Sequence, residues 1–307
     1  MPTLGDTVNA RLAEIKEALA QRAQGIVVTP YISTGLASWD RNGGILRGIL
    51  TVIGAATGEG KSIVKLQLAR GAAKDLHRVL MLDFEDPAGK TADRAFSHAT
   101  GINNRLLGLL DVDDFDLNRL EAAAVEINEW APRVEHHCGL VDTRRCLEIM
   151  EASPADIMLV DYAQAFPEDD DRSMERTIAD FAWKANEMAQ RKNCAIVVFS
   201  QIVREVEQRG YRIFERSRFK EPDKIDVSGF CPSGLGDISW AKTLGERAKE
   251  LGYLWRENRI AKKLGAPVKD NRIRVIFAKV NFGDEKDLIF EWDGPGARIR
   301  DLPKKAP

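Results

Sequence analysis

The chain has 307 residues, of which 44% are hydrophobic and 30% are charged, and its formal net charge at pH 7 is −2. This length suits one large α/β domain or two small ones. The near-neutral charge neither requires nor excludes a nucleic-acid partner, because basic groups can gather in a few loops. The sequence contains no apolar run of about 18 residues, so we expect no membrane span.

The cysteines and the N-terminus predict a cytoplasmic protein. Four cysteines are scattered without a CxxC spacing, which is typical of reduced thiols. The N-terminal segment carries acids and lacks the apolar core of a signal peptide. His136, His137 and Cys138 stand together and raise the question of a metal site. Adjacent strand residues point to opposite faces, so we expect a surface or strand-edge segment there instead.

Residues 6–24 predict an amphipathic helix ahead of the main domain. Its apolar residues recur at spacings of four, three and four, which forms one stripe: Val8, Leu12, Ile15 and Leu19. We expect residues 1–30 to form this helix and a linker, and residues 31–307 to form the main domain. The stripe packs either on its own domain or on a neighbouring subunit.

From residue 49 onward, short apolar runs alternate with helical segments. Strands are predicted at residues 49–54, 78–84, 156–161, 194–200, 275–280 and 288–292. Helices are predicted at residues 62–74 and 174–191. This alternation is typical of an α/β fold with a doubly wound, mostly parallel sheet and helices on both faces. Residues 205–236 have weak periodicity and many charges, which predicts a long functional loop.

A glycine-rich segment joins the first of these strands to the first helix, which is the context of a phosphate-binding loop. The segment reads Ala55, Ala56, Thr57, Gly58, Glu59, Gly60, Lys61 and Ser62, and we expect ATP to bind from Ala56 onward. Backbone N–H groups and the helix N-terminus face the phosphates in such a loop. We expect Lys61 to reach the β- and γ-phosphates and Ser62 to bind Mg²⁺. Ala55 replaces the usual first glycine.

Three polar positions follow predicted strands and complete the expected site. Asp161 ends an apolar run at the strand end that faces the ligand crevice, and we expect it to support Mg²⁺. Glu85 is our candidate for the base that activates water, with Asp83 and Asp86 as alternatives. Gln201 is expected to contact the γ-phosphate or the attacking water, although it also suits a simple loop position.

The order of these segments resembles the DnaB family of replicative helicases, from about Ser33 to Gly294. The matching stretches are residues 33–40, the alanine at position 55, Phe84-Glu85-Asp86, Asp161-Tyr162-Ala163-Gln164, and residues 200–209. The resemblance implies a RecA-type fold, with Glu85 as the catalytic base. It also implies a homo-oligomeric, hexameric ring with ATP sites between subunits and single-stranded DNA in the central channel.

The same resemblance bears on the N-terminal helix and on partners. In the DnaB family, a helix before the motor domain packs on the adjacent subunit. The family's N-terminal primase-binding domain has no counterpart in this sequence, so we expect a short form that acts with a separate primase or loader. A short form of this kind suits a phage or mobile-element replication protein.

Three departures from the family pattern concern the subunit boundary and DNA. The closing hairpin keeps Lys279, which the resemblance places in the neighbour's ATP site, but Asn281 stands where the family has an arginine. An arginine at this position can accelerate hydrolysis strongly in the neighbouring site. Either Lys279 is enough for this role, another arginine takes the place of Asn281, or hydrolysis is slow. In the DNA loop the family's arginine is missing, and the segment carries Ser239, Trp240 and Lys242 instead. The acidic pair after that loop is replaced by basic residues.

In residues 203–224, basic and aromatic side chains are interleaved along the sequence. Basic side chains can bind the phosphates of a nucleic acid, and aromatic side chains can stack on its bases. Acids in the same segment also suit a solvated surface. The resemblance favours DNA, with Arg204 and Arg209 among the contacts. We therefore predict a ring-forming helicase that couples ATP hydrolysis to translocation on single-stranded DNA during replication. The alternative is a RecA- or KaiC-like ATPase that acts as an assembly or regulatory factor without unwinding.

Overall fold

The computed structural model describes residues 3–24, 31–139, 141–161, 174–202, 248–256, 271–280 and 287–303. Two compact units make up the chain, Met1–Tyr31 and Ile32–Pro307. The first contains helix α1 (Leu4–Ala23), which confirms the predicted N-terminal helix. The side chains of its apolar stripe are all exposed, between 45% and 58%: Val8, Leu12, Ile15 and Leu19.

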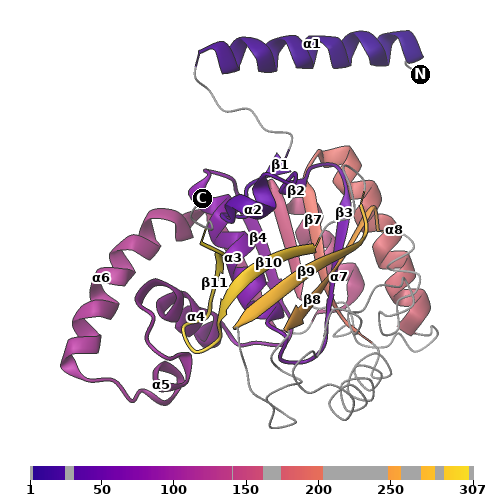
Figure 1. The fold of residues 1–307 in the computed structure, drawn as a ribbon. Coiled ribbons are helices and arrows are strands. Elements are labelled where there is room, and N and C mark those ends of the chain that lie inside the picture. The colour runs from indigo at the N-terminus through magenta and orange to yellow at the C-terminus, as the bar shows by residue number, and fades with distance from the viewer. Residues whose placement is uncertain are drawn as a thin grey trace, which may run out of the picture. The chain divides into compact units, whose positions relative to one another are not determined.

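The second unit is built on a nine-stranded sheet (Figure 1) with the strand order β11-β10-β9-β8-β3-β7-β6-β4-β5. The strands are β3 (Leu50–Ala55), β4 (Val79–Asp83), β5 (Val134–Cys138), β6 (Ile157–Asp161), β7 (Ala195–Gln201), β8 (Glu250–Arg256), β9 (Arg272–Lys279), β10 (Asp287–Asp293) and β11 (Arg298–Asp301). The pairings from β5 through β3 to β8 are parallel, whereas β8 to β11 pair antiparallel. The predicted mostly parallel sheet is therefore confirmed.

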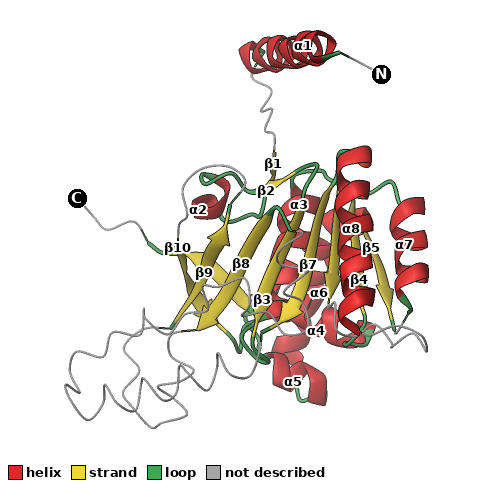
Figure 2. Cartoon of the chain, turned by 90° about the vertical axis from the view of Figure 1, so that its right-hand side faces the viewer, coloured by secondary structure: helices red, strands yellow, loops and turns green. Residues whose placement is uncertain are grey.

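Helices cover both faces of this sheet (Figure 2), as the sequence predicts. They are α2 (Ala37–Asp40), α3 (Lys61–Lys74), α4 (Ala88–Thr100), α5 (Asn104–Leu109), α6 (Asp114–Trp130), α7 (Thr143–Ala152) and α8 (Met174–Lys192), with a 3-10 turn at Ala131–Arg133. Two short strands, β1 (Tyr31–Ile32) and β2 (Ile45–Leu46), precede β3.

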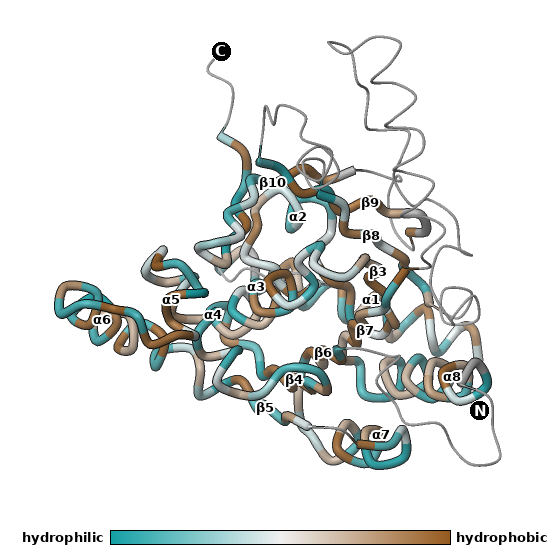
Figure 3. Tube along the Cα trace, turned by 90° about the horizontal axis from the view of Figure 1, so that it is seen from below, coloured by the Kyte–Doolittle hydropathy of each residue, from teal (hydrophilic) through white to brown (hydrophobic). Residues whose placement is uncertain are grey.

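Alternate residues of the central strands supply two separate cores. Met158 and Val160 of β6 belong to the cluster that includes Phe181 of α8, on one face of the sheet. Ile157 and Leu159 belong to the cluster on the other face, which includes residues of α3. This period of two explains why the run at 157–160 is apolar throughout, since a strand covered on both faces exposes no side chain. Figure 3 shows the same apolar character along the inner strands.

Strand β5 lies at the edge of the sheet, which agrees with the expectation for its histidines. The His137 ring pairs with Glu135, with Nε2 2.7 Å from the carboxylate, while His136 Nε2 lies 3.1 Å from Cys138 Sγ. Within the described residues, no group of three histidine, cysteine or acidic side chains is arranged to hold a metal ion. The helices described here include none that is long and apolar enough to cross a membrane.

Candidate nucleotide-binding site

The glycine-rich segment connects β3, in the middle of the sheet, to the first turn of α3. Ile63 and Val64 donate their backbone N–H groups to the Gly60 carbonyl at 3.0 Å, so the helix starts immediately after the loop. Lys61 is its first residue and Ser62 its second. Because β3 pairs in parallel with both β7 and β8, the loop emerges at the edge where parallel strands place their ligands.

Residues from the far end of the chain hold this loop in place. The Trp292 ring lies so close to Gly60 that a Cβ atom at position 60 would stand 2.5 Å from Cη2. The Arg256 guanidinium stacks over Trp292, 4.6 Å from the ring centroid, and its Nη1 donates to the Gly58 carbonyl at 3.0 Å. The Arg256 backbone N–H donates to the Glu59 carboxylate at 2.8 Å. Neither Arg256 nor Trp292 was predicted as a site residue: Trp292 ends a predicted strand, and no element was predicted at Arg256.

A cavity of about 280 Å³ opens over the loop, near the lower end of the range for ligand pockets. Its lining includes seven of the predicted residues: Thr57, Gly58, Gly60, Lys61, Ser62, Glu85 and Gln201. Ala56 and Glu59 are buried in the loop itself. The structure thus brings together side chains that lie up to 144 residues apart in the sequence.

The Lys61 ammonium lies in a largely buried position beside the cavity. Burial lowers the pKa of Lys61, and the carboxylates of Asp161 and Glu85 act in the opposite direction without cancelling that effect. An anionic ligand in the cavity would favour the charged ammonium, since an opposite charge nearby raises the pKa of a lysine. A phosphate chain has the right charge for this position.

Asp161 lies at the end of β6 and uses its two carboxylate oxygens differently. Its Oδ2 accepts a bond from Lys65 Nζ at 2.7 Å, whereas its Oδ1 is buried without a hydrogen-bond partner among the described residues. Ser62, the other predicted metal residue, lines the cavity and places its hydroxyl 3.4 Å from Asp86. Hydrated Mg²⁺ prefers oxygen ligands and keeps several of its waters, so this donor set fits the ion.

The three acids at the end of β4 and just after it, Asp83, Glu85 and Asp86, have different surroundings. The strand ends at Asp83 and residues 84–86 bend, so Glu85 does not continue the strand that carries Asp83. Burial favours a raised pKa for Asp83, but His136 and Lys65 outweigh it and lower that pKa below its usual range. Asp83 is fully buried, whereas Glu85 is exposed and faces the cavity.

Asp86, the second alternative base, is already held by cations. Its Oδ2 accepts a bond from Arg94 Nη1 at 2.7 Å, and its Oδ1 lies 3.3 Å from Lys90 Nζ. Burial favours a raised pKa for Asp86, but Arg94 lowers it overall. Of the three acids, Glu85 therefore best meets the geometric needs of a water-activating base.

Gln201 reaches the phosphate loop from the end of β7. Its Nε2 donates to the Thr57 hydroxyl at 2.8 Å, and its backbone is the parallel partner of Ala55. This position is consistent with the expected contact to a γ-phosphate. The alternative of a simple loop position for Gln201 is wrong, because the residue is the last of strand β7.

The remaining predicted positions lie outside what the structure describes. Lys279 is the last residue of β9, but its side chain is not described. Asn281 also lies outside the described residues, as do all five predicted DNA contacts: Arg204, Arg209, Ser239, Trp240 and Lys242.

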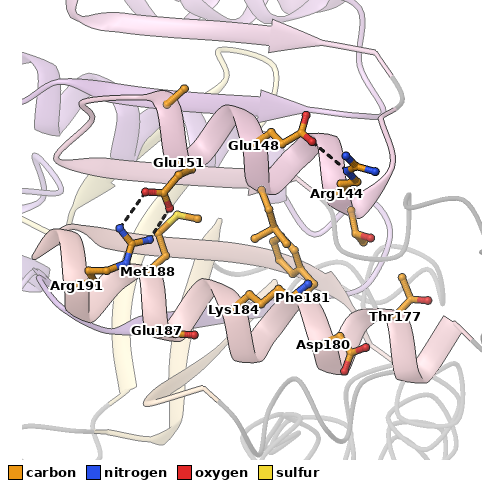
Figure 4. A pocket seen from close by; sticks show the side chains of 13 residues that line it. Arg144, Glu148, Glu151, Thr177, Asp180, Phe181, Lys184, Glu187, Met188 and Arg191 are labelled. Carbon is orange, nitrogen blue, oxygen red and sulfur yellow. Dashed lines mark hydrogen bonds and ion pairs between the residues drawn. The ribbon is translucent and has the colours of Figure 1, made fainter.

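A larger cavity of about 720 Å³ lies between α7 and α8 (Figure 4). Its apolar side chains include Leu147, Phe181 and Met188, and charged pairs such as Glu151 with Arg191 stand beside them. It contains no glycine-rich loop and none of the predicted ATP-site residues. Size alone therefore does not identify the nucleotide site, whereas the smaller cavity has the phosphate-binding chemistry.

Known proteins give this site a family context. The family model described as DnaB-like helicase C terminal domain matches residues 31–228. A protein of Chlamydia trachomatis serovar L2 named "Probable plasmid replicative DNA helicase" is 26% identical over 203 residues, covering 63% of this chain and 44% of the relative. A protein of the same name from Chlamydia muridarum is 24% identical over 201 residues, covering 64% and 44%. The chain thus spans less than half the length of these curated relatives.

Solved structures show the same fold at low sequence identity. One solved ATPase domain has a TM-score of 0.76 at 18% identity and covers 95% of this chain and 99% of its own. A DnaB-like replicative helicase, solved in work on its interactions with primase, has a TM-score of 0.75 at 18% identity, covering 99% of this chain and 68% of its own. The RadB recombinase, at 16% identity, has a TM-score of 0.51 and covers 89% and 100%.

These structural likenesses confirm the RecA-like architecture that the sequence predicts. The family match covers well over half of the chain and includes the phosphate loop, Glu85 and Asp161. This chain therefore belongs to the family of DnaB-like helicase C-terminal domains.

Proposed function

We propose that this chain is the ATP-hydrolysing motor of a ring-forming DNA helicase that moves along single-stranded DNA during replication. The observation that carries the proposal is the cavity where Lys61, Ser62 and Glu85 meet at the end of β3. Family membership and the names of the curated relatives, which are replicative helicases, support the same function. Nothing observed favours the alternative of a regulatory ATPase without unwinding activity.

Each residue has a distinct task in this proposal. Residues 56–62 wrap the phosphates of ATP, and Lys61 neutralises charge on the β- and γ-phosphates. Ser62 and Asp161 would hold Mg²⁺ and its waters, and the ion would supply positive charge for phosphoryl transfer. Glu85 orients and deprotonates the attacking water, and Gln201 contacts the γ-phosphate.

We also propose that the chain assembles as a homo-oligomer, a hexameric ring, with Lys279 contributing to the neighbour's ATP site. The exposed apolar stripe of α1 supports this, because an isolated amphipathic helix gains most of its stability from burying such a face. In this assignment residues 1–30 are the connecting helix and linker, and residues 31–307 are the motor domain. A separate primase or loader completes the proposed machinery. The proposed location is the cytoplasm, and the proposed origin of the chain is a plasmid or another mobile element.

DNA contacts are assigned to the segment that follows β7. Arg204 and Arg209 would follow the phosphate backbone, as would Lys242, while Trp240 would stack on a base. Ser239 adds a polar contact. Since β7 ends at Gln201, this segment is directly connected to the ATP cavity.

The test is ATP hydrolysis measured with and without single-stranded DNA. We expect stimulation by single strands that exceeds stimulation by duplex and that falls as salt rises. Lys61→Ala is the control and should abolish hydrolysis without lowering the melting temperature of the nucleotide-free protein. If wild-type protein with a non-hydrolysable ATP analogue binds no DNA, the regulatory ATPase becomes the better assignment.

Two variants separate the proposed DNA contacts. Trp240→Ala should weaken single-strand binding by about 1–3 kcal/mol, the usual loss for one base–aromatic stack. Lys242→Ala should mainly flatten the salt dependence, because a phosphate contact releases a counterion. A lower melting temperature with unchanged DNA affinity in Trp240→Ala would assign that residue to packing instead.

A further inference from the structure

A second lysine of α3 is buried beneath the nucleotide site. Lys65 follows Lys61 by one helical turn, so both lie on the same side of α3, yet Lys65 is only 1% exposed. Its Nζ donates to Asp83 Oδ2 at 2.6 Å and to Asp161 Oδ2 at 2.7 Å. Asp83 and Asp161 are direct partners in the parallel pairing of β4 with β6. One ammonium therefore joins the ends of two neighbouring strands.

Three buried charges in contact are costly unless each has partners, because desolvation of an ion in a protein interior costs several kcal/mol. Asp83 has several partners besides Lys65. Its Oδ1 accepts the Asp86 backbone N–H at 3.1 Å, and the Thr91 hydroxyl lies 3.4 Å from its Oδ2. Removing Lys65 would thus leave Asp83 with other hydrogen bonds.

The position of Asp161 is different. Among the described residues, the Lys65 ammonium is the side-chain cation within bonding distance of its carboxylate, and this bond uses Oδ2. The other oxygen, Oδ1, is buried and has no hydrogen-bond partner in the same part of the chain. A carboxylate that is anchored at one oxygen cannot rotate freely, so the direction of the second oxygen is fixed.

We propose that Lys65 is a positioning residue that anchors Asp161 through Oδ2 and thereby aims Oδ1 at hydrated Mg²⁺ before the ion arrives. The ammonium also acts as a tethered counter-ion for the Asp83 and Asp161 pair. Preorganisation of this kind lowers the cost of binding, because the ligand is already held in its productive orientation. The inference rests on the Mg²⁺ site proposed above and adds a residue outside the cavity lining.

Three variants of the full chain separate anchoring from general packing. Lys65→Met keeps the unbranched side chain but removes the ammonium. Asp83→Asn is the matched control, because it alters the same cluster while leaving the bond between Lys65 and Asp161. The double variant Lys65→Met/Asp83→Asn restores the net charge of the wild-type cluster without restoring the anchor. Two quantities are measured: the melting temperature and the Mg²⁺ midpoint for binding of a fluorescent ATP analogue.

We expect Asp83→Asn to keep its Mg²⁺ midpoint within about twofold of wild type. Lys65→Met and the double variant should both need at least about tenfold more Mg²⁺, which corresponds to about 1.4 kcal/mol. The double variant should nevertheless recover most of the melting temperature lost in Lys65→Met. This combination of results would show that the higher Mg²⁺ midpoint comes from loss of the bond between Lys65 and Asp161.

Other outcomes decide against the inference. If the double variant has the wild-type Mg²⁺ midpoint, Lys65 only balances the charge of the cluster and does not position Asp161. If the double variant does not fold, the role of Lys65 is to stabilise the fold. If Lys65→Met alone fails to fold, the comparison of the double variant with Asp83→Asn still decides. Wild-type binding that is independent of Mg²⁺ would instead overturn the metal assignment itself.

Discussion

The side-chain amide of Gln201 is hydrogen-bonded to the hydroxyl of Thr57, with 2.8 Å between Nε2 and Oγ1. This bond joins the end of β7 to the phosphate loop. The segment proposed to contact DNA begins just after Gln201. A change in the nucleotide that moves Thr57 would therefore reach the start of that segment through one side chain.

Gln201→Ala should uncouple the two sites. We expect binding of an ATP analogue to stay within about fivefold of wild type, since a net hydrogen bond contributes about 1 kcal/mol. Stimulation of hydrolysis by single-stranded DNA should be largely lost. Steady-state hydrolysis across a DNA titration measures this. Full stimulation in Gln201→Ala would show that the signal follows another route.

Gly60→Ala should damage the phosphate loop. The backbone φ at Gly60 is +102°, which is strained for any residue with a Cβ, and that atom would meet the Trp292 ring. We expect a loss of about 1–3 kcal/mol in stability, together with weaker ATP binding. The matched control is Gly89→Ala at the start of α4, where a Cβ meets no atom within 4 Å. Denaturant unfolding of both variants measures the difference, and equal stability would contradict the contact with Trp292.

Glu85→Gln should trap ATP. The change removes the proposed base but keeps Lys61, Ser62 and Asp161, so nucleotide binding should persist while hydrolysis falls by about 10²-fold or more. Asp86→Asn is the comparison, because Asp86 is engaged by Arg94. Single-turnover hydrolysis measures both variants. A larger loss of turnover in Asp86→Asn than in Glu85→Gln would reassign the base.

The apolar stripe of α1 should stabilise the oligomer. Burial of about 300–400 Å² of this stripe would contribute roughly 8–10 kcal/mol before ordering costs. The double variant Leu12→Asp/Ile15→Asp should therefore reduce the assembly to smaller species. Glu17→Lys, on the same helix, is the control and should leave the mass unchanged. Light scattering measures the mass, and an intact assembly in Leu12→Asp/Ile15→Asp would show that α1 packs elsewhere.

The sequence predicts the central strands well because they are covered on both faces and read as unbroken apolar runs, as at residues 157–160. It predicts the phosphate loop because the residues that bind phosphate are contiguous. Helices α4 to α7 were not predicted, and several of their large apolar side chains are exposed, including Leu109 and Phe115. Strand β8 was missed as well, although six of its seven residues are buried.

Long-range contacts of the site were beyond prediction for a different reason. Lys65 meets acids 18 and 96 residues away, and a lysine one turn after Lys61 gives no local signal of burial. The contact between Trp292 and Gly60 likewise depends on where β10 lies in the sheet. The i, i+4 spacing of Lys61 and Lys65 is the one clue that both face the sheet.

The start of the second unit has a mechanical consequence for the proposed motor. Gly71 of α3 packs so closely on Thr34 that a Cβ at position 71 would stand 2.2 Å from the Thr34 carbonyl carbon. The Gln67 amide also donates to the Thr34 carbonyl at 2.9 Å. Tension that reaches Thr34 along the chain from α1 is therefore borne by α3, the helix that begins at Lys61. A subunit that pulls on its neighbour through this connection would load the ATP site directly.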